Sequence, residues 1–346
     1  MLTRNEVIQL RKDLLEWFER AKRDLPWRRT RDAYAIWVSE AMLQQTRVAA
    51  VLPYYERFLK LYPNIEALAQ APEKELLAAW AGLGYYYRAR NLRKAAQQMC
   101  GNGGFPSCYA KLRALPGVGD YTAAAVASMA FDLPHAVVDG NVLRVLARLF
   151  ADPTDIGSMR GHKHFAKLAE MLLDREQPGA FNQAMMELGA TVCLTRKPQC
   201  LLCPAASYCR AAKTGAPERF PVKSPKQPPI REERVLFWIE REGRVLAWQR
   251  SADSRLMPGF WELPERAQIG EAQSETSFGT FRHSITIHHY SFDVRKASAP
   301  EKSHGCEWLS LSGIEAFPIS TVFRKAIELM RAGGRRNKSA YRAGKG

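Results

Sequence analysis

Residues 115–128 read LPGVGDYTAAAVAS, and this stretch decides how the first half of the chain is expected to fold. Gly117 and Gly119 stand one residue apart between two stretches of helical periodicity, and glycine allows a tight turn without side chains. Such a turn can bring backbone amides and the start of the next helix against a phosphate group. The same pattern also occurs in ordinary connectors of helical hairpins, so the turn alone does not indicate a function.

Helical periodicity continues on both sides of this turn, from residue 1 to about residue 213, with short breaks at proline and glycine. We therefore predict an all-helical domain over residues 1–213. Residues 214–230 are rich in proline and basic residues, which is typical of an extended linker. Beyond it, strand-like runs predict a smaller α+β domain over 231–332, with strands over 235–240, 244–249 and 286–294, a helix over 321–331 and a basic tail over 333–346.

The composition favours a polyanionic partner. Lysine and arginine number 51 against 35 aspartate and glutamate, which gives a net charge of +16, and nucleic acid is the commonest partner of such a chain. The N-terminal residues are amphipathic and charged, without the apolar core of a signal peptide, and no apolar run has the length of a membrane span. We expect a cytoplasmic, nucleoid-associated protein whose seven cysteines are reduced.

Four of the cysteines lie within 17 residues, in the spacing Cys193-x6-Cys200-x2-Cys203-x5-Cys209. In a reduced protein this density of thiols is typical of metal coordination, and both zinc and a 4Fe-4S cluster accept four thiolates. The first gap of six residues differs from the paired spacing of most zinc ribbons and favours iron-sulfur. Ligand chemistry alone leaves both metals open.

Glu40 is the first candidate for acid–base chemistry. Residues 33–52 are predicted to form one helix, which Asp32 could cap, and Glu40 shares a face of it with apolar residues at i−4, i−3 and i+3. Burial disfavours the carboxylate anion and raises the pKa, as a general acid at neutral pH requires. A carboxylate that reaches solvent or pairs with Arg47 is an equally supported alternative.

Asp139 is the second candidate. It follows an apolar run and precedes Gly140 and Asn141, after which residues 142–150 are predicted to be helical. The positive end of that helix is expected to keep Asp139 ionised. A neutral Glu40 and an anionic Asp139 would form the pair of unlike carboxyl groups used in cleaving glycosidic bonds. Helix capping is the commoner role for such an aspartate, and the sequence does not establish that the two carboxyl groups meet.

Further motifs stand in a characteristic order: WVSEAMLQQTRV at 37–48, GLGYYYRARNL at 82–92, LPGVGDYTAAAVAS at 115–128, VVDGNVLRVLARLF at 137–150, FNQAMMELGATVC at 181–193, and then the cysteine spacing. By these motifs the chain resembles the MutY-type adenine DNA glycosylases of the endonuclease III superfamily. The resemblance implies one 4Fe-4S cluster with a structural and DNA-binding role, held by Cys193, Cys200, Cys203 and Cys209. It also implies a helix-hairpin-helix turn that holds DNA phosphate through Leu115, Gly117, Val118 and Gly119.

The resemblance also assigns roles in the chemistry. It implies that Glu40 protonates the adenine ring at N7, that Asp139 stabilises the oxocarbenium-like sugar or bonds to it transiently, and that Tyr121 and Asn141 support them. Relatives that also cut the strand carry a lysine two residues after the GVG turn, where this chain has Tyr121. We therefore predict a monofunctional enzyme that hydrolyses the N-glycosidic bond and leaves an abasic site.

The implied partner is double-stranded DNA that contains adenine opposite 8-oxoguanine or guanine, bound by a monomer. The adenine must leave the duplex to reach a buried site. Residues that match the family's inserting and DNA-contacting positions are Gln44, Gln45, Thr46 and Tyr85. Ordinary packing is the alternative interpretation of the tyrosines at 85–87, and we prefer it for Tyr86 and Tyr87.

Residues 231–332 resemble the MutT-like recognition domain of the same family, best at LMPGFWELP over 256–264. The glutamate-rich magnesium helix of pyrophosphatases is absent after Pro264, so that activity is not expected. The family's Phe-Ser-His triplet, which helps detect 8-oxoguanine, is replaced by residues 285–287, Ile-Thr-Ile, with His288 and His289 adjacent. These histidines are as readily explained by a strand with solvent-facing polar residues.

Three other functions are compatible with parts of the sequence. A bifunctional glycosylase for oxidised pyrimidines is disfavoured by Tyr121 and by the second domain. A DNA-binding protein without activity, which would use the cluster structurally or as a redox sensor, is disfavoured by the presence of both Glu40 and Asp139. A Nudix hydrolase with a helical extension is disfavoured by the missing metal box.

Overall fold

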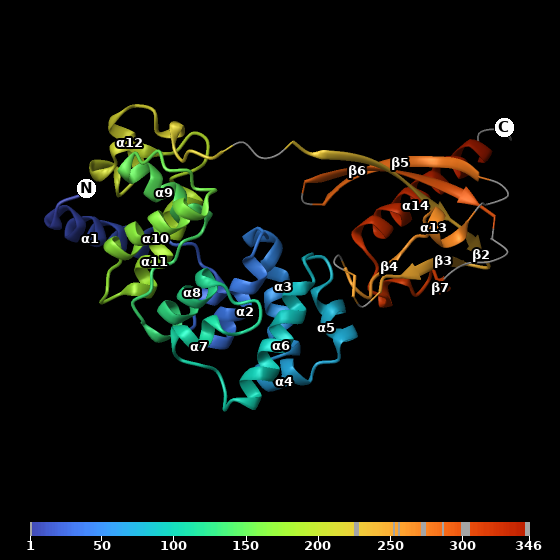
Figure 1. Ribbon diagram of the computed structural model, residues 1–346, viewed down its shortest axis with the longest axis horizontal. Helices are drawn as coiled ribbons and strands as arrows, with labels where there is room; N and C mark the ends of the chain where they lie inside the picture. Colours follow the sequence, from blue (N-terminus) through green and yellow to red (C-terminus); the bar gives the residue numbers. More distant parts are fainter. Residues whose placement is uncertain are drawn as a thin grey trace. The chain divides into compact units, whose positions relative to one another are not determined.

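The computed structural model describes residues 2–224, 228–251, 253–254, 257–270, 275–285, 287–298 and 305–342, with 333–342 as backbone only. The chain divides into two compact units (Figure 1). The first comprises Met1–Pro72 and Gly82–Pro225, and the second comprises Glu73–Ala81 and Lys226–Gly346. None of the described helices combines the length and the apolar character that a membrane span needs.

The first unit is helical throughout its described residues, as the periodicity predicts (Figure 1). Its α-helices are α1 (Arg4–Ala21), α2 (Ala33–Leu43), α3 (Val48–Leu61), α4 (Ile65–Gln70), α6 (Tyr87–Gly101), α7 (Tyr109–Arg113), α8 (Asp120–Phe131), α9 (Gly140–Phe150), α10 (Met159–Leu172), α11 (Pro178–Thr191) and α12 (Arg210–Lys213). Short 3-10 turns are η1 (Pro26–Arg28), η2 (Cys200–Leu202), η3 (Ala206–Tyr208) and η4 (Pro217–Arg219).

One hydrophobic core joins α1, α9, α10 and α11. Helix α9 contributes the largest share of it, because nearly every residue after its first turn is buried. Asp139 caps the start of α9, and the cysteine stretch packs near its end through Cys193, Cys203 and Cys209. The two sets of candidate residues are therefore positioned by one rigid helix.

Helix α8 follows the glycine turn and packs closely on two neighbours, α2 and α11. Its residues from Thr122 to Ser128 are all buried, and small side chains permit this close approach. At the start of α11, a Cβ atom on Gly179 would lie 2.6 Å from the carbonyl oxygen of Ser128, so only glycine fits there. The alanine-rich sequence thus brings the start of α8 next to the ends of α2 and α11.

The single helix predicted over 33–52 is wrong, because two helices occupy this stretch. Helix α2 ends at Leu43, and α3 begins at Val48. Between them Gln45 has a left-handed backbone, with φ of 59°. The Arg88 guanidinium donates to the carbonyl oxygens of Ala41, Met42 and Gln44, which a continued α2 would bond within the helix. Periodicity could not reveal this break, because its cause lies on another helix.

The segment that composition predicts as a linker begins as part of the first unit, which extends to Pro225. Phe220 packs against the core, and the backbone amide of Ile156 donates to the carbonyl oxygen of Val222 at 3.1 Å. Arg148 donates to the carbonyl oxygens of Pro217 and Phe220 at 3.0 and 2.9 Å. These contacts hold a proline-rich stretch that has little apolar content of its own.

The second unit is an α+β fold, as predicted, and its described strands form two sheets. In one, β6 (His288–Ala297) lies between a parallel partner, β1 (Ile230–Trp238), and an antiparallel partner, β5 (Glu275–Ile285). In the other, β3 (Arg244–Gln249) pairs antiparallel with three short strands, β2 (Glu240–Arg241), β4 (Trp261–Glu262) and β7 (Cys306–Ser310). The shorter helical elements of this unit are α5 (Glu73–Trp80), α13 (Arg266–Ile269) and η5 (Ile314–Ala316).

Helix α14 (Thr321–Arg342) closes the second unit. It continues past residue 331, which is the end that the sequence predicts for this helix. Its residues Val322, Phe323, Ala326 and Ile327 pack with the strands in one core, on the face that the spacing predicts. The strand predicted over 286–294 begins instead at His288 and ends at Ala297, and Thr286 lies outside the described residues. The sequence did not predict β5, whose residues lack a regular alternation.

Candidate active site

Glu40 lies in the middle of α2 and is only 4% exposed, because this helix is enclosed on nearly every side. Its Oε2 atom has no hydrogen-bond partner among the described residues. Burial is the main reason why the pKa of Glu40 rises to about 7, and the charge of Asp139 adds to this rise. A hydrogen bond with Tyr121 and the charge of Arg28 oppose it. Glu40 can therefore carry a proton at neutral pH.

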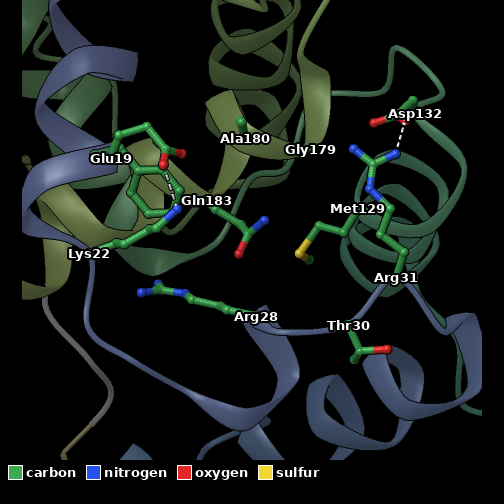
Figure 2. Close-up of a pocket in the computed structure, with 11 residues that line it drawn as sticks. Glu19, Lys22, Arg28, Thr30, Arg31, Met129, Asp132, Gly179, Ala180 and Gln183 are labelled. Carbon is green, nitrogen blue, oxygen red and sulfur yellow. Dashed lines mark hydrogen bonds and ion pairs between the residues drawn. The ribbon is translucent and has the colours of Figure 1, made fainter.

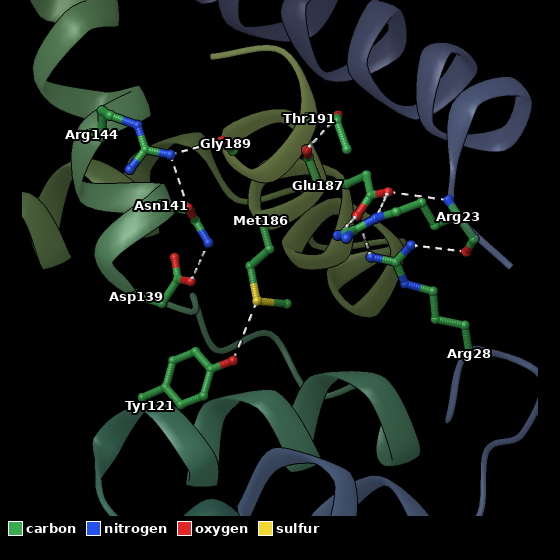
Figure 3. A network of polar contacts seen from close by, with 10 residues as sticks. All are labelled: Arg23, Arg28, Tyr121, Asp139, Asn141, Arg144, Met186, Glu187, Gly189 and Thr191. Carbon is green, nitrogen blue, oxygen red and sulfur yellow. Dashed lines mark hydrogen bonds and ion pairs between the residues drawn. The ribbon is translucent and has the colours of Figure 1, made fainter. Parts of the chain in front are cut away.

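Asp139 caps α9, as expected for an aspartate before a helix. Its Oδ1 accepts from the backbone amide of Val142 at 2.7 Å. Its Oδ2 accepts from Nδ2 of Asn141 at 3.0 Å, as Figure 3 shows. Burial nevertheless raises the pKa of Asp139, and these hydrogen bonds and the charge of Arg144 only oppose the rise. The sequence-based expectation considered only the positive helix end and neglected the effect of burial on the pKa of Asp139. Asp139 nevertheless has two hydrogen-bond donors that stabilise its anion, whereas the Oε2 atom of Glu40 has none among the described residues.

Tyr121 stands in the first turn of α8. Burial, and then the charges of Glu40 and Asp139, raise the pKa of its hydroxyl well above the usual value. The hydroxyl lies 3.4 Å from Sδ of Met186 (Figure 3). It also takes part in a hydrogen bond with Glu40. A phenol that stays neutral can donate a proton to a hydrogen bond, but it cannot act as an amine nucleophile. Glu40, Tyr121 and Asp139 thus come from three helices and interact at one site.

Asn141 is oriented by Arg144, one turn further along α9. The Nη2 atom of Arg144 donates to Oδ1 of Asn141 at 2.9 Å and to the carbonyl oxygen of Gly189 at 2.7 Å (Figure 3). A Cβ atom on Gly189 would lie 2.5 Å from Cβ of Asn141, so α11 can pass this close only with glycine. The Asn141 amide is therefore held with its nitrogen toward Asp139.

Sequence reasoning missed a buried ion cluster next to this site. Glu187 on α11 is fully buried and accepts two hydrogen bonds from the side chain of Arg23, each at 2.7 Å, and one from Arg28 at 2.8 Å (Figure 3). These partners outweigh burial and lower the pKa of Glu187 to about 2. The only signal in the sequence is an isolated acidic residue within the apolar stretch of α11.

A pocket of about 180 Å³ is lined in part by Arg28 (Figure 2). Its lining residues are Phe18, Glu19, Lys22, Arg28, Thr30, Arg31, Met129, Asp132, Gly179, Ala180 and Gln183. The three cations already have acidic partners, since Lys22 pairs with Glu19, Arg31 with Asp132 and Arg28 with Glu187. None of the sequence-predicted site residues lines this pocket, and we assign it no function.

Two surface loops carry the residues expected to contact DNA. The link between α2 and α3 holds Gln44, Gln45 and Thr46, and the Nε2 atom of Gln44 lies 3.4 Å from Oγ1 of Thr122 in α8. The loop before α6 holds Tyr85, which is 50% exposed and has a left-handed backbone with φ of 48°. Both loops therefore present side chains on strained backbones.

The hairpin joins α7 to α8. Leu115 and Val118 are buried and anchor the turn, while Gly117 has φ of 75° and approaches Asn91 so closely that a Cβ atom would lie 2.7 Å from Cβ of that residue. Gly119 occupies the N-cap of α8 without a side chain to satisfy the first backbone amides. That these amides bind an anion, as the glycine spacing predicts, stays a prediction.

The four clustered cysteines are near neighbours. Burial and the charges of Cys193, Cys200 and Cys209 raise the pKa of the Cys203 thiol to about 12. Arg148, buried in α9, points Nη1 at Sγ of Cys193 from 3.3 Å. Among the described residues, no group of three or more His, Cys, Asp or Glu side chains is arranged to hold a metal ion.

The β5–β6 hairpin carries the residues that replace the Phe-Ser-His triplet. Ile287 is exposed at its tip, and Thr286 is not among the described residues. Nδ1 of His288 lies 2.5 Å from the carboxylate of Glu232, and the His288 ring stacks on Tyr290. His289 is exposed on the strand. His288 is therefore held within its own sheet, while His289 faces solvent.

Comparisons with known proteins cover both the sequence and the fold. Residues 38–171 match the HhH-GPD family, described as a superfamily of base excision DNA repair proteins. The chain is 35% identical to the adenine DNA glycosylase of Mus musculus over 403 aligned residues, which cover 94% of this chain and 78% of that protein. It is 39% identical to the adenine DNA glycosylase of Arabidopsis thaliana over 329 residues, covering 83% of this chain but only 51% of that protein.

Solved structures resemble the helical part. A thermostable thymine-DNA glycosylase superimposes with a TM-score of 0.55 at 30% identity and covers 61% of this chain and 98% of its own. A trapped covalent intermediate of endonuclease III with DNA gives a TM-score of 0.53 at 26% identity, with 62% and 99% covered. Both proteins act on DNA, and both lack a counterpart for more than a third of this chain.

Proposed function

The chain belongs to the family of adenine DNA glycosylases, helix-hairpin-helix enzymes of base excision repair, and on that premise we propose that it removes adenine mispaired with 8-oxoguanine or guanine. It hydrolyses the N-glycosidic bond and leaves an abasic site in double-stranded DNA. The observation that carries this proposal is the pair of carboxyl groups in unlike settings. Glu40 has an unpartnered oxygen in a buried site, whereas Asp139 has two hydrogen-bond donors.

Glu40 acts as the general acid that protonates adenine at N7. A carboxyl group whose pKa is near 7 holds its proton at neutral pH and gives it up readily to a leaving base. The unpartnered Oε2 atom leaves the position from which that proton would be donated free for the base. Tyr121 fixes the carboxyl orientation through its hydrogen bond.

Asp139 stabilises the positive charge that develops on the sugar as the bond to adenine breaks. The backbone amide of Val142 and the amide of Asn141 support its anionic form, and Asn141 is itself held by Arg144. A carboxylate fixed in this way faces the sugar without reorganisation during the reaction. Water then completes the hydrolysis.

We expect little strand cleavage. Tyr121 occupies the position after the hairpin where strand-cutting relatives carry a lysine, and its neutral hydroxyl cannot form a Schiff base with the opened sugar. Strand breaks that appear without alkali or heat, at the rate of adenine release, would contradict this assignment.

DNA is held by the hairpin and probed by the two loops. The open amides at the start of α8 bind phosphate next to Leu115, Gly117, Val118 and Gly119. When the adenine is extruded, the duplex is entered by the side chains of the two loops, which are Gln44, Gln45, Thr46 and the exposed Tyr85. The second unit would examine the base opposite the adenine, with the hairpin tip at Ile285 and Ile287 in place of the family triplet.

A 4Fe-4S cluster would be held by Cys193, Cys200, Cys203 and Cys209. Four mutually interacting thiols in one loop are the ligand set that such a cluster takes, and the Arg148 guanidinium is a hydrogen-bond donor of the kind that tunes cluster sulfurs. When bound, the cluster would order the loop, and the basic surface for DNA would come from the residues Arg196, Lys197 and Arg210 in and beside this loop.

Elemental analysis tests the cluster. Purified protein should contain about four iron atoms and matching acid-labile sulfide per chain, and Cys203→Ser should lose both. Cys306→Ser, at a half-buried cysteine outside the loop, is the control that should retain them. Stoichiometric zinc without iron would contradict the assignment.

Single-turnover adenine release tests the function. Duplexes with A:8-oxoguanine, A:G and A:T are compared, and alkali is added to half of each sample only to reveal abasic sites. We expect release from the first two duplexes and its loss in Asp139→Asn. Asp32→Asn is the matched control, because it changes another helix-capping aspartate and asparagine caps equally well. Release from A:T at the same rate, or no release at all, would refute the proposal.

A further inference from the structure

We propose that Arg88 is a positioning residue that fixes the two DNA-contacting loops, residues 44–46 and 83–85, in a single arrangement. The inference rests on the proposed function, because it assumes that these loops enter the duplex. Its physical basis is separate, since it lies in the hydrogen bonds of one buried guanidinium group.

Arg88 stands at the start of α6 and is only 3% exposed. One side of its guanidinium group donates hydrogen bonds to the end of α2 and to the first loop. The Nη1 atom donates to the carbonyl oxygens of Ala41 at 3.0 Å, Met42 at 2.8 Å and Gln44 at 2.6 Å. These are the carbonyl groups that the interruption of α2 leaves without helical partners.

The second terminal nitrogen of Arg88, Nη2, connects the two loops. Nη2 donates to Oγ1 of Thr46 at 3.2 Å in the first loop, and to the carbonyl oxygens of Leu83 at 2.9 Å and Gly84 at 3.1 Å in the second. The guanidinium carbon also lies 5.5 Å from the ring centre of Tyr85. One planar group therefore sets the distance between Thr46 and Tyr85.

Both loops require such support. Gln45 and Tyr85 adopt left-handed backbones, which are unfavourable for residues with a side chain, and such conformations persist only where the surroundings enforce them. The six acceptors named above are all oxygen atoms, and they come from the end of α2 and from both loops. A geometric role, which needs several donors in one plane, accounts for arginine at this position.

Lysine would keep the charge but could not reproduce the planar set of donors. If Arg88 couples the loops, Arg88→Lys should reduce the preference for mismatched over matched duplex by about tenfold. It should also reduce the fluorescence rise of 2-aminopurine placed in the mismatch, which reports unstacking of the base. A general loss of stability would lower binding to both duplexes equally.

The decisive test measures coupling between the loops. Thr46→Val removes the hydroxyl that accepts from Nη2 while it keeps the side-chain shape, and Thr46→Ser keeps the hydroxyl as the matched control. Tyr85→Ala is then introduced into each background, and mismatch affinity is measured by titration. The loss caused by Tyr85→Ala should be at least about threefold smaller in Thr46→Val than in Thr46→Ser, as for residues in one hydrogen-bond network. This comparison remains available if Arg88→Lys does not fold.

Equal losses in the two backgrounds, with a wild-type preference for the mismatch, would overturn the role of Arg88 and leave the proposed function intact. A wild-type protein that releases no adenine and shows no mismatch preference would overturn both. Reduced unstacking in Arg88→Lys together with non-additive losses would establish the coupling.

Discussion

Two buried glutamates on helices that both pack on α8, Glu40 in α2 and Glu187 in α11, have opposite electrostatic properties. Both are almost inaccessible to solvent. Glu187 is surrounded by the guanidinium groups of Arg23 and Arg28, and its pKa falls to about 2. Glu40 has an unpartnered oxygen and faces Asp139, and its pKa rises to about 7. Burial alone therefore does not assign a role, because the partners of each carboxyl group decide whether it is a structural anion or an available acid.

The largest expected effect is on catalysis at Glu40. Glu40→Gln keeps the size and removes the ionisable proton, and single-turnover adenine release should slow by about 10²- to 10⁴-fold, the usual contribution of a general acid. Mismatch binding, measured in the same samples, should change little. A variant that releases adenine within a few-fold of the wild-type rate would place the acid elsewhere.

The next largest effect is on stability at Glu187. Glu187→Gln leaves two arginines without their anion, and the free energy of unfolding at pH 7 should fall by about 3 kcal/mol. Because the folded pKa lies below the ordinary 4.5, the stabilisation is present above pH 4.5 and is lost as the pH falls toward about 2. Chemical denaturation of both proteins at several pH values checks this. A constant difference between them down to pH 2 would contradict the assigned cause.

Glu40→Gln should act in the opposite direction on stability. The folded pKa is above 4.5, so the ionised form is disfavoured in the folded protein, and the stability that the proton provides is lost as the pH rises through about 7. The variant should therefore gain about 1 kcal/mol or more over wild type above that pH, and not below pH 4.5. Denaturation midpoints of the two proteins at both ends of this range measure the gain. Equal midpoints throughout would show that Glu40 is not desolvated.

The smallest effect concerns the link between the two glutamates. Arg28 bonds Glu187, and its charge lowers the pKa of Glu40. Arg28→Met should therefore move the pH at which adenine release declines upward, whereas Arg29→Met, at an exposed arginine paired with Asp24, should leave it unchanged. A shift to lower pH in Arg28→Met would contradict this electrostatic connection.

The sequence predicted the features that depend on local pattern. Helical periodicity identified the first unit, and strand-like runs identified the α+β second unit. The apolar face around Glu40 left burial and solvent exposure equally supported, and the structure buries this residue. The Asp139 cap followed from its position before a helix. Such features are set within one or two turns of chain, where the side-chain order is visible in the sequence.

Features with a distant cause were not predictable in this way. The carbonyl groups at the break between α2 and α3 are bonded by Arg88, which lies more than forty residues further along the chain. The ion cluster joins Arg23 and Arg28 to Glu187 across the unit, and the ordered start of the proline-rich segment depends on Arg148. The raised pKa of Asp139 depends on how deeply α9 begins inside the fold. Each required the tertiary structure.

The most direct test of the central claim is the pH dependence of single-turnover adenine release by the wild-type protein from an A:8-oxoguanine duplex, followed from about pH 5 to about pH 9. If protonated Glu40 is the acid, the rate should decline about tenfold per pH unit above a midpoint near 7, and Glu40→Gln should lack this decline. A rate that stays constant through pH 7, or that declines from pH 4.5 like an ordinary glutamate, would contradict the account.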